Sequence, residues 1–177
     1  SFLFGFNELV LEKKGDPKKL FEESGLSSKL LLSNNHVIVF SRFIGLLSKA
    51  SQQLQCPDIA FELSDKQDVL LYAPVAYLLS ECQSVNQAID YYLKYFSVLM
   101  NGCQIAIVRN KTFFKYVFTC DQIDIEKNKH YQDYCLAVPR SVMKSTISEN
   151  FTVRAVSFLR TAKNQEEISR YSRYFGC

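Results

Sequence analysis

The chain has 177 residues, 47% of them hydrophobic, and a formal net charge of +3 at pH 7. This length and composition allow one buried core, and so small a charge does not by itself indicate a nucleic-acid partner. No run reaches the roughly eighteen apolar residues of a membrane span, and the first residues lack the basic start and cleavage site of a signal peptide. We therefore expect one cytoplasmic domain over residues 1–177, with a helical subregion at 1–68, an α+β subregion at 69–177 and no membrane contact.

The N-terminal part of the chain is predicted to be helical. A first helix is expected to end near Gly15, where Asp16-Pro17 has the pattern of an N-cap followed by proline in the first turn. Gly25 is expected to end that second helix, because glycine is the usual residue just beyond a helix C-terminus. Further helices are predicted from about Ser41 to Leu54 and from Pro57-Asp58 onward.

The segment KKLFEESGLSSKLL has the outline of a helix-turn-helix, with Gly25 at the turn. Its second helix would last little more than one turn before Ser33, and Lys29 is the cation that it carries. That charge is too small for the phosphate contacts that position a recognition helix. We expect this segment not to read DNA.

The stretch from Leu70 to Phe118 predicts an apolar helix, an amphipathic helix and a β-hairpin. Ser84 and Gln87 stand three residues apart, the capping-box spacing in which each side chain accepts a hydrogen bond from a backbone N–H of the first turn. The sequence CQIAIVRNKTFFKYVF predicts an antiparallel hairpin over 103–119. The amphipathic helix that starts after Ser84 and precedes this hairpin has one face that is apolar throughout: Val85, Ala88, Ile89, Tyr92, Leu93, Phe96 and Leu99.

The C-terminal part is predicted to hold a long helix, a strand and a final helix. The long helix is expected to run to about Glu149, with a kink or an interruption at Pro139. FTVRAVSFL alternates and carries β-branched residues, which predicts a strand at 151–159, and NQEEISRYSRYF predicts the last helix. The expected fold class is α+β: a helical N-terminal half followed by a small antiparallel sheet, made of the hairpin and the 151–159 strand, packed by helices.

Patterns that carry catalytic chemistry are missing from the sequence. His36 and His130 lie far apart, without a cysteine or carboxylate at metal-ligand spacing. There is no glycine-rich phosphate loop, no Gly-x-Ser-x-Gly and no His-Glu-x-x-His. We expect no catalytic residue, no metal site and no cofactor, and the chain is predicted not to be an enzyme.

The six cysteines form no Cys-x-x-Cys pair and lie mostly among apolar residues. This pattern favours free, packing thiols in a reducing compartment. Cys103 and Cys120 would lie nearly opposite each other in the hairpin, where a redox bridge is geometrically feasible, although thiols on sheet faces are usually inert.

Ten tyrosines and fourteen phenylalanines are a high aromatic content. Tyrosines at helical spacing usually pack in a core, and that interpretation is favoured here. The alternative is a pocket with apolar walls and hydroxyl groups, the usual composition of a small-molecule site. In that hypothesis an effector binds between the 84–100 helix and the hairpin, Tyr91 contributes to the pocket wall, and the candidate effector-binding residues are Tyr72, Tyr77, Tyr92, Tyr95, Arg109 and Lys115.

Several blocks of the sequence resemble one regulatory family. PKKLFEESGLSSKLL is similar to the opening of the arabinose-binding-like N-terminal domain of AraC-type bacterial transcriptional regulators, and HVIVFSRFIGLLSKASQQLQCPDIAFELSDKQ resembles its next block. There Ala60-Phe61 stands where the family usually has Gly-Leu. SECQSVNQAIDYYLKYFSVL resembles a family helix, with Ala88 and Ile89 in its Ala-Leu positions, and ISRYSRYFGC resembles the signature near the domain's end.

The resemblance implies the ligand-sensing and dimerising half of a transcriptional regulator. Such a domain binds a small-molecule effector, forms a homodimer and controls a C-terminal helix-turn-helix DNA-binding domain, which is absent from this chain and would be its one contact with DNA. Regulation would then be a population shift between two arrangements of the tethered DNA-binding domains. The alternative is a stand-alone interaction or dimerisation module without an effector, whose aromatic helix face binds protein.

Overall fold

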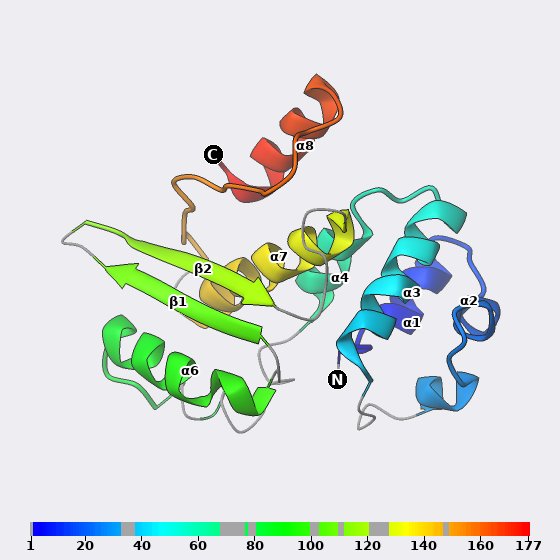
Figure 1. Cartoon of the computed structure of the whole chain (residues 1–177), viewed down its shortest axis with the longest axis horizontal. Coiled ribbons are helices and arrows are strands. Elements are labelled where there is room, and N and C mark those ends of the chain that lie inside the picture. The colour runs from blue at the N-terminus through cyan, green and yellow to red at the C-terminus, as the bar shows by residue number, and fades with distance from the viewer. Residues whose placement is uncertain are drawn as a thin grey trace.

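The computed structural model describes residues 2–32, 38–67, 77, 81–99, 103–109, 112–120, 128–146 and 149–177. The fold is α+β, with most helices in the N-terminal half and one two-stranded antiparallel sheet among these residues. The predicted apolar helix at 70–82 lies largely outside them. The elements, shown in Figure 1, are α1 (Phe6–Glu12), α2 (Pro17–Glu23), the 3-10 helix η1 (Ser28–Leu32), α3 (Phe40–Gln53), α4 (Ile59–Lys66), α6 (Val85–Leu99), β1 (Cys103–Arg109), β2 (Phe114–Cys120), α7 (Lys129–Thr146) and α8 (Gln165–Phe175).

The predicted boundaries of α2 are confirmed. The Asp16 carboxylate accepts hydrogen bonds from the backbone N–H groups of Lys18 and Lys19, at 2.9 and 3.2 Å. After α2, Gly25 adopts a φ of 67°, the left-handed conformation that glycine takes at low cost. The segment that follows forms the short 3-10 helix η1, so the described residues do not form the second helix of a helix-turn-helix.

The connection from α1 to α2 packs tightly against the end of α3. A Cβ atom at Gly15 would lie 2.4 Å from Cδ2 of Leu54 and 2.9 Å from Cγ1 of Val10. Only glycine leaves room for such a close approach. The glycine therefore allows the C-terminal end of α3 to reach the backbone between the first two helices.

The main hydrophobic core lies where α1–α4, the hairpin and α7 meet. Figure 1 shows α1, α2 and α3 on one side of the molecule, the hairpin and α6 on the other, and α4 and α7 between them. Phe43 of α3 is fully buried, with its ring centroid 4.9 Å from that of Tyr134 and 5.4 Å from that of Phe2. Contacts between α4 and α7 join the two sides of the fold.

The capping prediction for α6 is confirmed in a shifted form. The Ser84 hydroxyl accepts a hydrogen bond from the Gln87 N–H at 3.2 Å. The Gln87 side chain accepts one from the Gln83 N–H at 2.8 Å, one residue before the expected partner. Two backbone donors at the helix start are therefore satisfied by side chains, as a capping box requires.

The hairpin forms as predicted, with a register running from Cys103 opposite Cys120 to Arg109 opposite Phe114. Both cysteines are buried, and neither is in a disulfide. One face of the hairpin joins the main core through Ile105 and Phe118.

The predicted strand at 151–159 is wrong. Residues 151–159 are not assigned to a strand, and the sheet of the described residues consists of β1 and β2. The alternation has another cause: Val153, Val156 and Phe158 pack into a second hydrophobic cluster against α4, α7 and α8. The Leu159 N–H donates to the side chain of Gln132 at 3.0 Å rather than to a neighbouring strand.

Of the two outcomes predicted at Pro139, a kink or an interruption, the interruption is absent. Helix α7 continues through Pro139 as far as Thr146. Proline has no N–H, so the carbonyl of Cys135 loses its usual helical donor. Helix α7 packs against α4 and contributes Ala137 to the cluster with the C-terminal segment, and these contacts hold it on both sides of Pro139.

Among the helices of the described ranges, none is both long and apolar enough to cross a membrane.

Candidate functional site

The tyrosines predicted to line an effector site have different environments. Tyr77 is 68% exposed, and Tyr72 lies outside the described residues. Tyr92 is partly buried and packs against the main core. Tyr95 is half-buried, with the ammonium group of Lys94 5.2 Å from its ring centroid. The structure thus packs Tyr92 against the main core, and Tyr95 is partly buried outside that core.

The two predicted cations lie on opposite faces of the hairpin. Arg109 pairs in register with Phe114, and Lys115 pairs with Val108. Successive side chains alternate across a strand, so these two pairs point in opposite directions. Nη2 of Arg109 lies 2.5 Å from Oδ1 of Asp90 on α6. The structure therefore brings Arg109 to α6 and places Lys115 on the other side of the hairpin.

A buried cluster of charged groups, which the sequence analysis missed, lies between α7 and α8. The Asp133 side chain is fully buried, and its carboxylate accepts hydrogen bonds from Lys129 Nζ and Tyr171 Oη, each at 2.5 Å. Arg160 donates to Tyr171 Oη at 2.5 Å and lies 3.1 Å from the Glu167 carboxylate. These five residues form what we call the Asp133 cluster, in which two cations face two carboxylates.

Local structure explains how the Asp133 cluster assembles. Lys129 and Asp133 stand four residues apart on α7, so they share one helix face. At the start of α8, the Asn164 side chain accepts the Glu167 N–H at 2.9 Å, and Glu167 accepts the Lys163 N–H at 2.7 Å. This capping pair holds Glu167 toward Arg160.

Burial and neighbouring charges act in opposite directions on the two carboxylates. For Asp133, burial dominates and raises the pKa above its usual value, although Lys129, Tyr171 and Arg160 act to lower it. For Glu167, burial also acts to raise the pKa, but the Lys163 N–H and the charge of Arg160 outweigh it, so the pKa is lowered. Opposed shifts within one cluster are frequent at functional sites.

His130, next to this cluster, makes stability depend on pH. Burial and the positive charges of Lys129, Arg160 and Lys163 lower its pKa from 6.5 to about 4. Below pH 6.5 the unfolded chain binds a proton at this imidazole and the folded chain does not. The free energy of unfolding therefore decreases as the pH is lowered, until the imidazole of the folded chain is protonated as well.

We expect the free energy of unfolding of the wild type, relative to that of His130→Gln, to fall by up to about 3 kcal/mol as pH drops from neutral to the folded-state pKa. Urea denaturation at several pH values measures this difference. Asp133 titrates in both the wild type and His130→Gln, so its contribution cancels in the difference between their free energies of unfolding. A difference that does not change with pH would contradict the neutral, buried imidazole.

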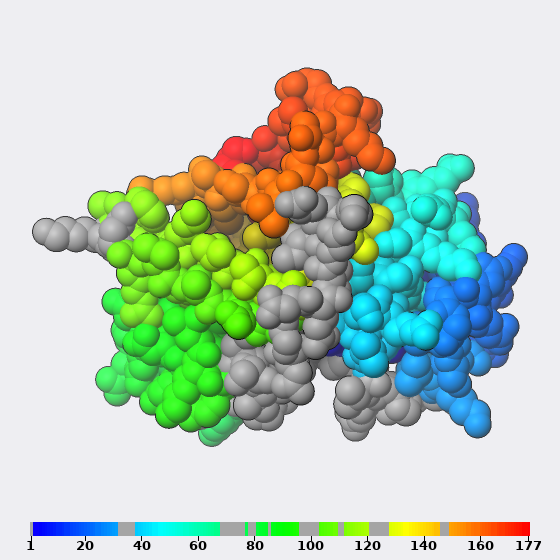
Figure 2. Space-filling view, viewed as in Figure 1, coloured from blue at the N-terminus to red at the C-terminus, as the bar shows by residue number. Residues whose placement is uncertain are grey.

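A small pocket of about 180 Å³ lies beside the Asp133 cluster. Its walls include Val156, Phe158 and Phe175, and Arg160 and Tyr171 bring polar groups to it. Apolar walls with a few convergent polar groups are typical of small-molecule sites. Figure 2 shows the C-terminal segment, coloured orange to red, along the upper edge of the molecule. We call this pocket, between residues 156–162 and α8, the α8 pocket.

The described part of the chain holds no group of three or more His, Cys, Asp or Glu side chains placed to bind a metal ion. Its cysteines are all free.

Residues 15–177 match the family described as the arabinose-binding domain of AraC transcription regulators, at the N-terminus of those proteins. The chain belongs to this family. The resemblance stated from the sequence is thereby confirmed. No curated protein matches the chain.

Membership identifies this AraC-type domain as a ligand-sensing regulatory domain whose implied partner is a small-molecule effector. The family is one of regulatory ligand-binding domains and not of enzymes. The matched region includes both the hairpin with α6 and the α8 pocket. For the Asp133 cluster, the local signals in the sequence are the Asn164–Glu167 capping spacing and the Lys129–Asp133 spacing on α7.

Proposed function

We propose that this AraC-type domain binds its effector in the α8 pocket. Effector binding there is then communicated to a DNA-binding domain that follows α8 in the complete regulator. The observation that carries the proposal is that Arg160, Glu167 and Tyr171 line the α8 pocket and also belong to the Asp133 cluster. A ligand in this pocket therefore contacts the same groups that attach α8 to α7.

The mechanism follows from competition for these groups. Arg160 has 13% of its side chain exposed and is shared between Asp133, Glu167 and Tyr171. A ligand that accepts a hydrogen bond from Arg160 competes with these three partners for the guanidinium group. It thereby changes the strength of the attachment of α8 to α7. A ligand shifts such an equilibrium only by its difference in affinity for the two arrangements. The linked DNA-binding domain would respond to that shift.

The second candidate location is the interface of α6 with the hairpin, where Arg109 lies near Tyr92 and Tyr95 in the hypothesis drawn from the sequence. Its support is the approach of Arg109 to Asp90 of α6. Lys115 lies on the opposite face of the hairpin and would not contact the same ligand.

Ala162→Trp separates the two locations. Ala162 lines the α8 pocket and is not one of the five residues of the Asp133 cluster, so tryptophan fills the pocket while the charged groups remain. A thermal-shift screen of L-arabinose, other pentoses, amino acids and short carboxylic acids identifies a stabilising ligand. We expect Ala162→Trp to abolish the stabilisation and Arg109→Ala to retain it.

In the opposite result, Arg109→Ala would abolish the thermal stabilisation by the ligand and Ala162→Trp would retain it. That result would place the effector site between α6 and the hairpin. In the complete regulator, the same Ala162→Trp change should abolish the response of a promoter reporter to the ligand. A homodimer and a cytoplasmic location remain predictions from the sequence.

A further inference from the structure

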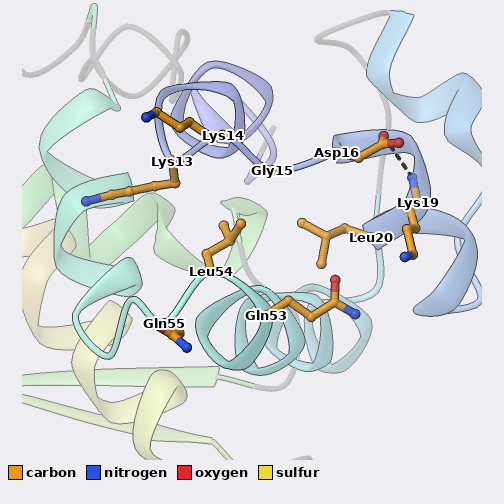
Figure 3. Close-up of a pocket in the computed structure, with 9 residues that line it drawn as sticks. All are labelled: Lys13, Lys14, Gly15, Asp16, Lys19, Leu20, Gln53, Leu54 and Gln55. Atoms are coloured by element: carbon orange, nitrogen blue, oxygen red, sulfur yellow. Dashed lines mark hydrogen bonds between the residues drawn. The ribbon is translucent and has the colours of Figure 1, made fainter.

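A second, more polar pocket lies where the connection between α1 and α2 meets the end of α3 (Figure 3). Its volume is about 330 Å³, which is within the usual range for small-molecule sites. Leu20 and Leu54 point into it and form an apolar base. Its polar lining comes mainly from three lysines and two glutamines: Lys13, Lys14, Lys19, Gln53 and Gln55.

The charge of this pocket is positive and only partly compensated. The one carboxylate in its lining, that of Asp16, already accepts the first backbone N–H groups of α2. Lys13 is paired with Glu62 at 2.8 Å. Lys19 is 67% exposed and stays 3.9 Å from Glu23. The backbone N–H of Lys14 donates to Leu11 O at 2.9 Å, whereas the Lys14 ammonium group makes no hydrogen bond or ion pair within the described ranges. Among the three lining lysines, Lys14 and Lys19 are thus less closely paired with a carboxylate than Lys13 is.

The backbone provides an independent observation. Lys14 and Gln55 have φ values of 60° and 50°, and they are the positive-φ residues other than glycine within the described segments. Both occupy the left-handed position just after a helix, because the Gly15 N–H bonds to Val10 O and the Cys56 N–H bonds to Ser51 O. Both line this pocket.

Glycine is the favoured residue at such positions, and another residue costs up to about 1 kcal/mol. The chain carries long polar side chains at both positions around one pocket. Strained backbone of this kind is often retained where a side chain has a function. Lysine near a helix C-terminus also offsets the helix dipole, which is a purely structural explanation.

We propose that this pocket binds a small polyvalent anion, either a polycarboxylate or a phosphate compound. The ammonium groups of Lys14 and Lys19 contact the charged groups of the ligand, and Gln55 contacts its hydrogen-bonding groups. The pocket is separate from the α8 pocket, since the two have no described lining residue in common. It would therefore serve as a second ligand site on the regulatory domain.

Lys14→Gly tests this proposal, because the structural and ligand-binding roles predict different results. We expect a higher melting temperature, since glycine relieves the left-handed strain, together with at least about tenfold weaker binding of citrate or of inorganic phosphate. Isothermal titration at fixed ionic strength measures the binding. Citrate and phosphate, titrated separately, distinguish the two ligand classes.

Two further variants control for conformation and for net charge. Lys14→Gln removes the charge while keeping a side chain in the left-handed position, and it should also weaken binding. Lys18→Gln removes a charge from the neighbouring turn outside the pocket lining and should leave binding unchanged. Binding that survives both Lys14 variants, binding that falls equally in Lys18→Gln, or the absence of binding by both anions would overturn the proposal.

Discussion

Replacing Asp133 with alanine should lower the free energy of unfolding by about 3–5 kcal/mol, the usual cost of removing one partner from a buried ion pair. The Asp133 side chain is completely buried, and its loss leaves Lys129 and Arg160 without the carboxylate that they share. Tyr171 loses its hydrogen-bond acceptor in the same step. Urea denaturation followed by circular dichroism measures the change.

Glu166→Ala is the matched control for this prediction. The Glu166 side chain is 77% exposed and pairs with Arg170 on the same helix at 3.2 Å. Exposed pairs of this kind contribute roughly 0–1 kcal/mol. If Asp133→Ala cost no more than Glu166→Ala, the Asp133 cluster would not be what attaches α8 to α7.

Replacing Phe43 with alanine should also cost about 3–5 kcal/mol, the usual range for removing a buried aromatic ring. Phe43 is fully buried, and its ring lies 4.9 Å from that of Tyr134 on α7 and 5.4 Å from that of Phe2. The substitution leaves a cavity where the N-terminal helices meet α7. The midpoint of urea unfolding should fall while its slope stays nearly constant.

Phe113→Ala provides the comparison, since the same atoms are removed from a residue that is 49% exposed. We expect Phe113→Ala to lower the free energy of unfolding by less than half as much as Phe43→Ala, because folding removes less of the Phe113 ring from water. Equal costs would show that the interior of the N-terminal helices is not the main source of stability.

The parts of the fold that local signals determine could be predicted from the sequence. Asp16-Pro17 and Ser84 with Gln87 mark helix starts through side chains that satisfy nearby backbone N–H groups. The hairpin was likewise predicted from the sequence CQIAIVRNKTFFKYVF, and its register places Cys103 opposite Cys120, as expected. These signals act within a few residues, so neighbouring sequence suffices to detect them.

The failures concern contacts between distant segments. The 151–159 alternation indicated a strand, but its apolar side chains pack on helices, and no partner strand is available in the described residues. The Asp133 cluster joins residues 38 positions apart, Asp133 and Tyr171. Charged residues at such separations usually lie on solvated surfaces, so the sequence alone gave no reason to bring them together.

The C-terminal segment packs into a second hydrophobic cluster, which it shares with Phe61 of α4 and Ala137 of α7 and which is distinct from the main core. Elements that are packed separately can open without global unfolding, and their amide protons then exchange with solvent at a lower free energy. We expect the amides of α8 to exchange deuterium sooner than those of α3, which lies in the main core. Residues 150–177 would then form a cooperative unit that detaches first, and the rest of the domain would remain folded while the connection to any following segment loosens.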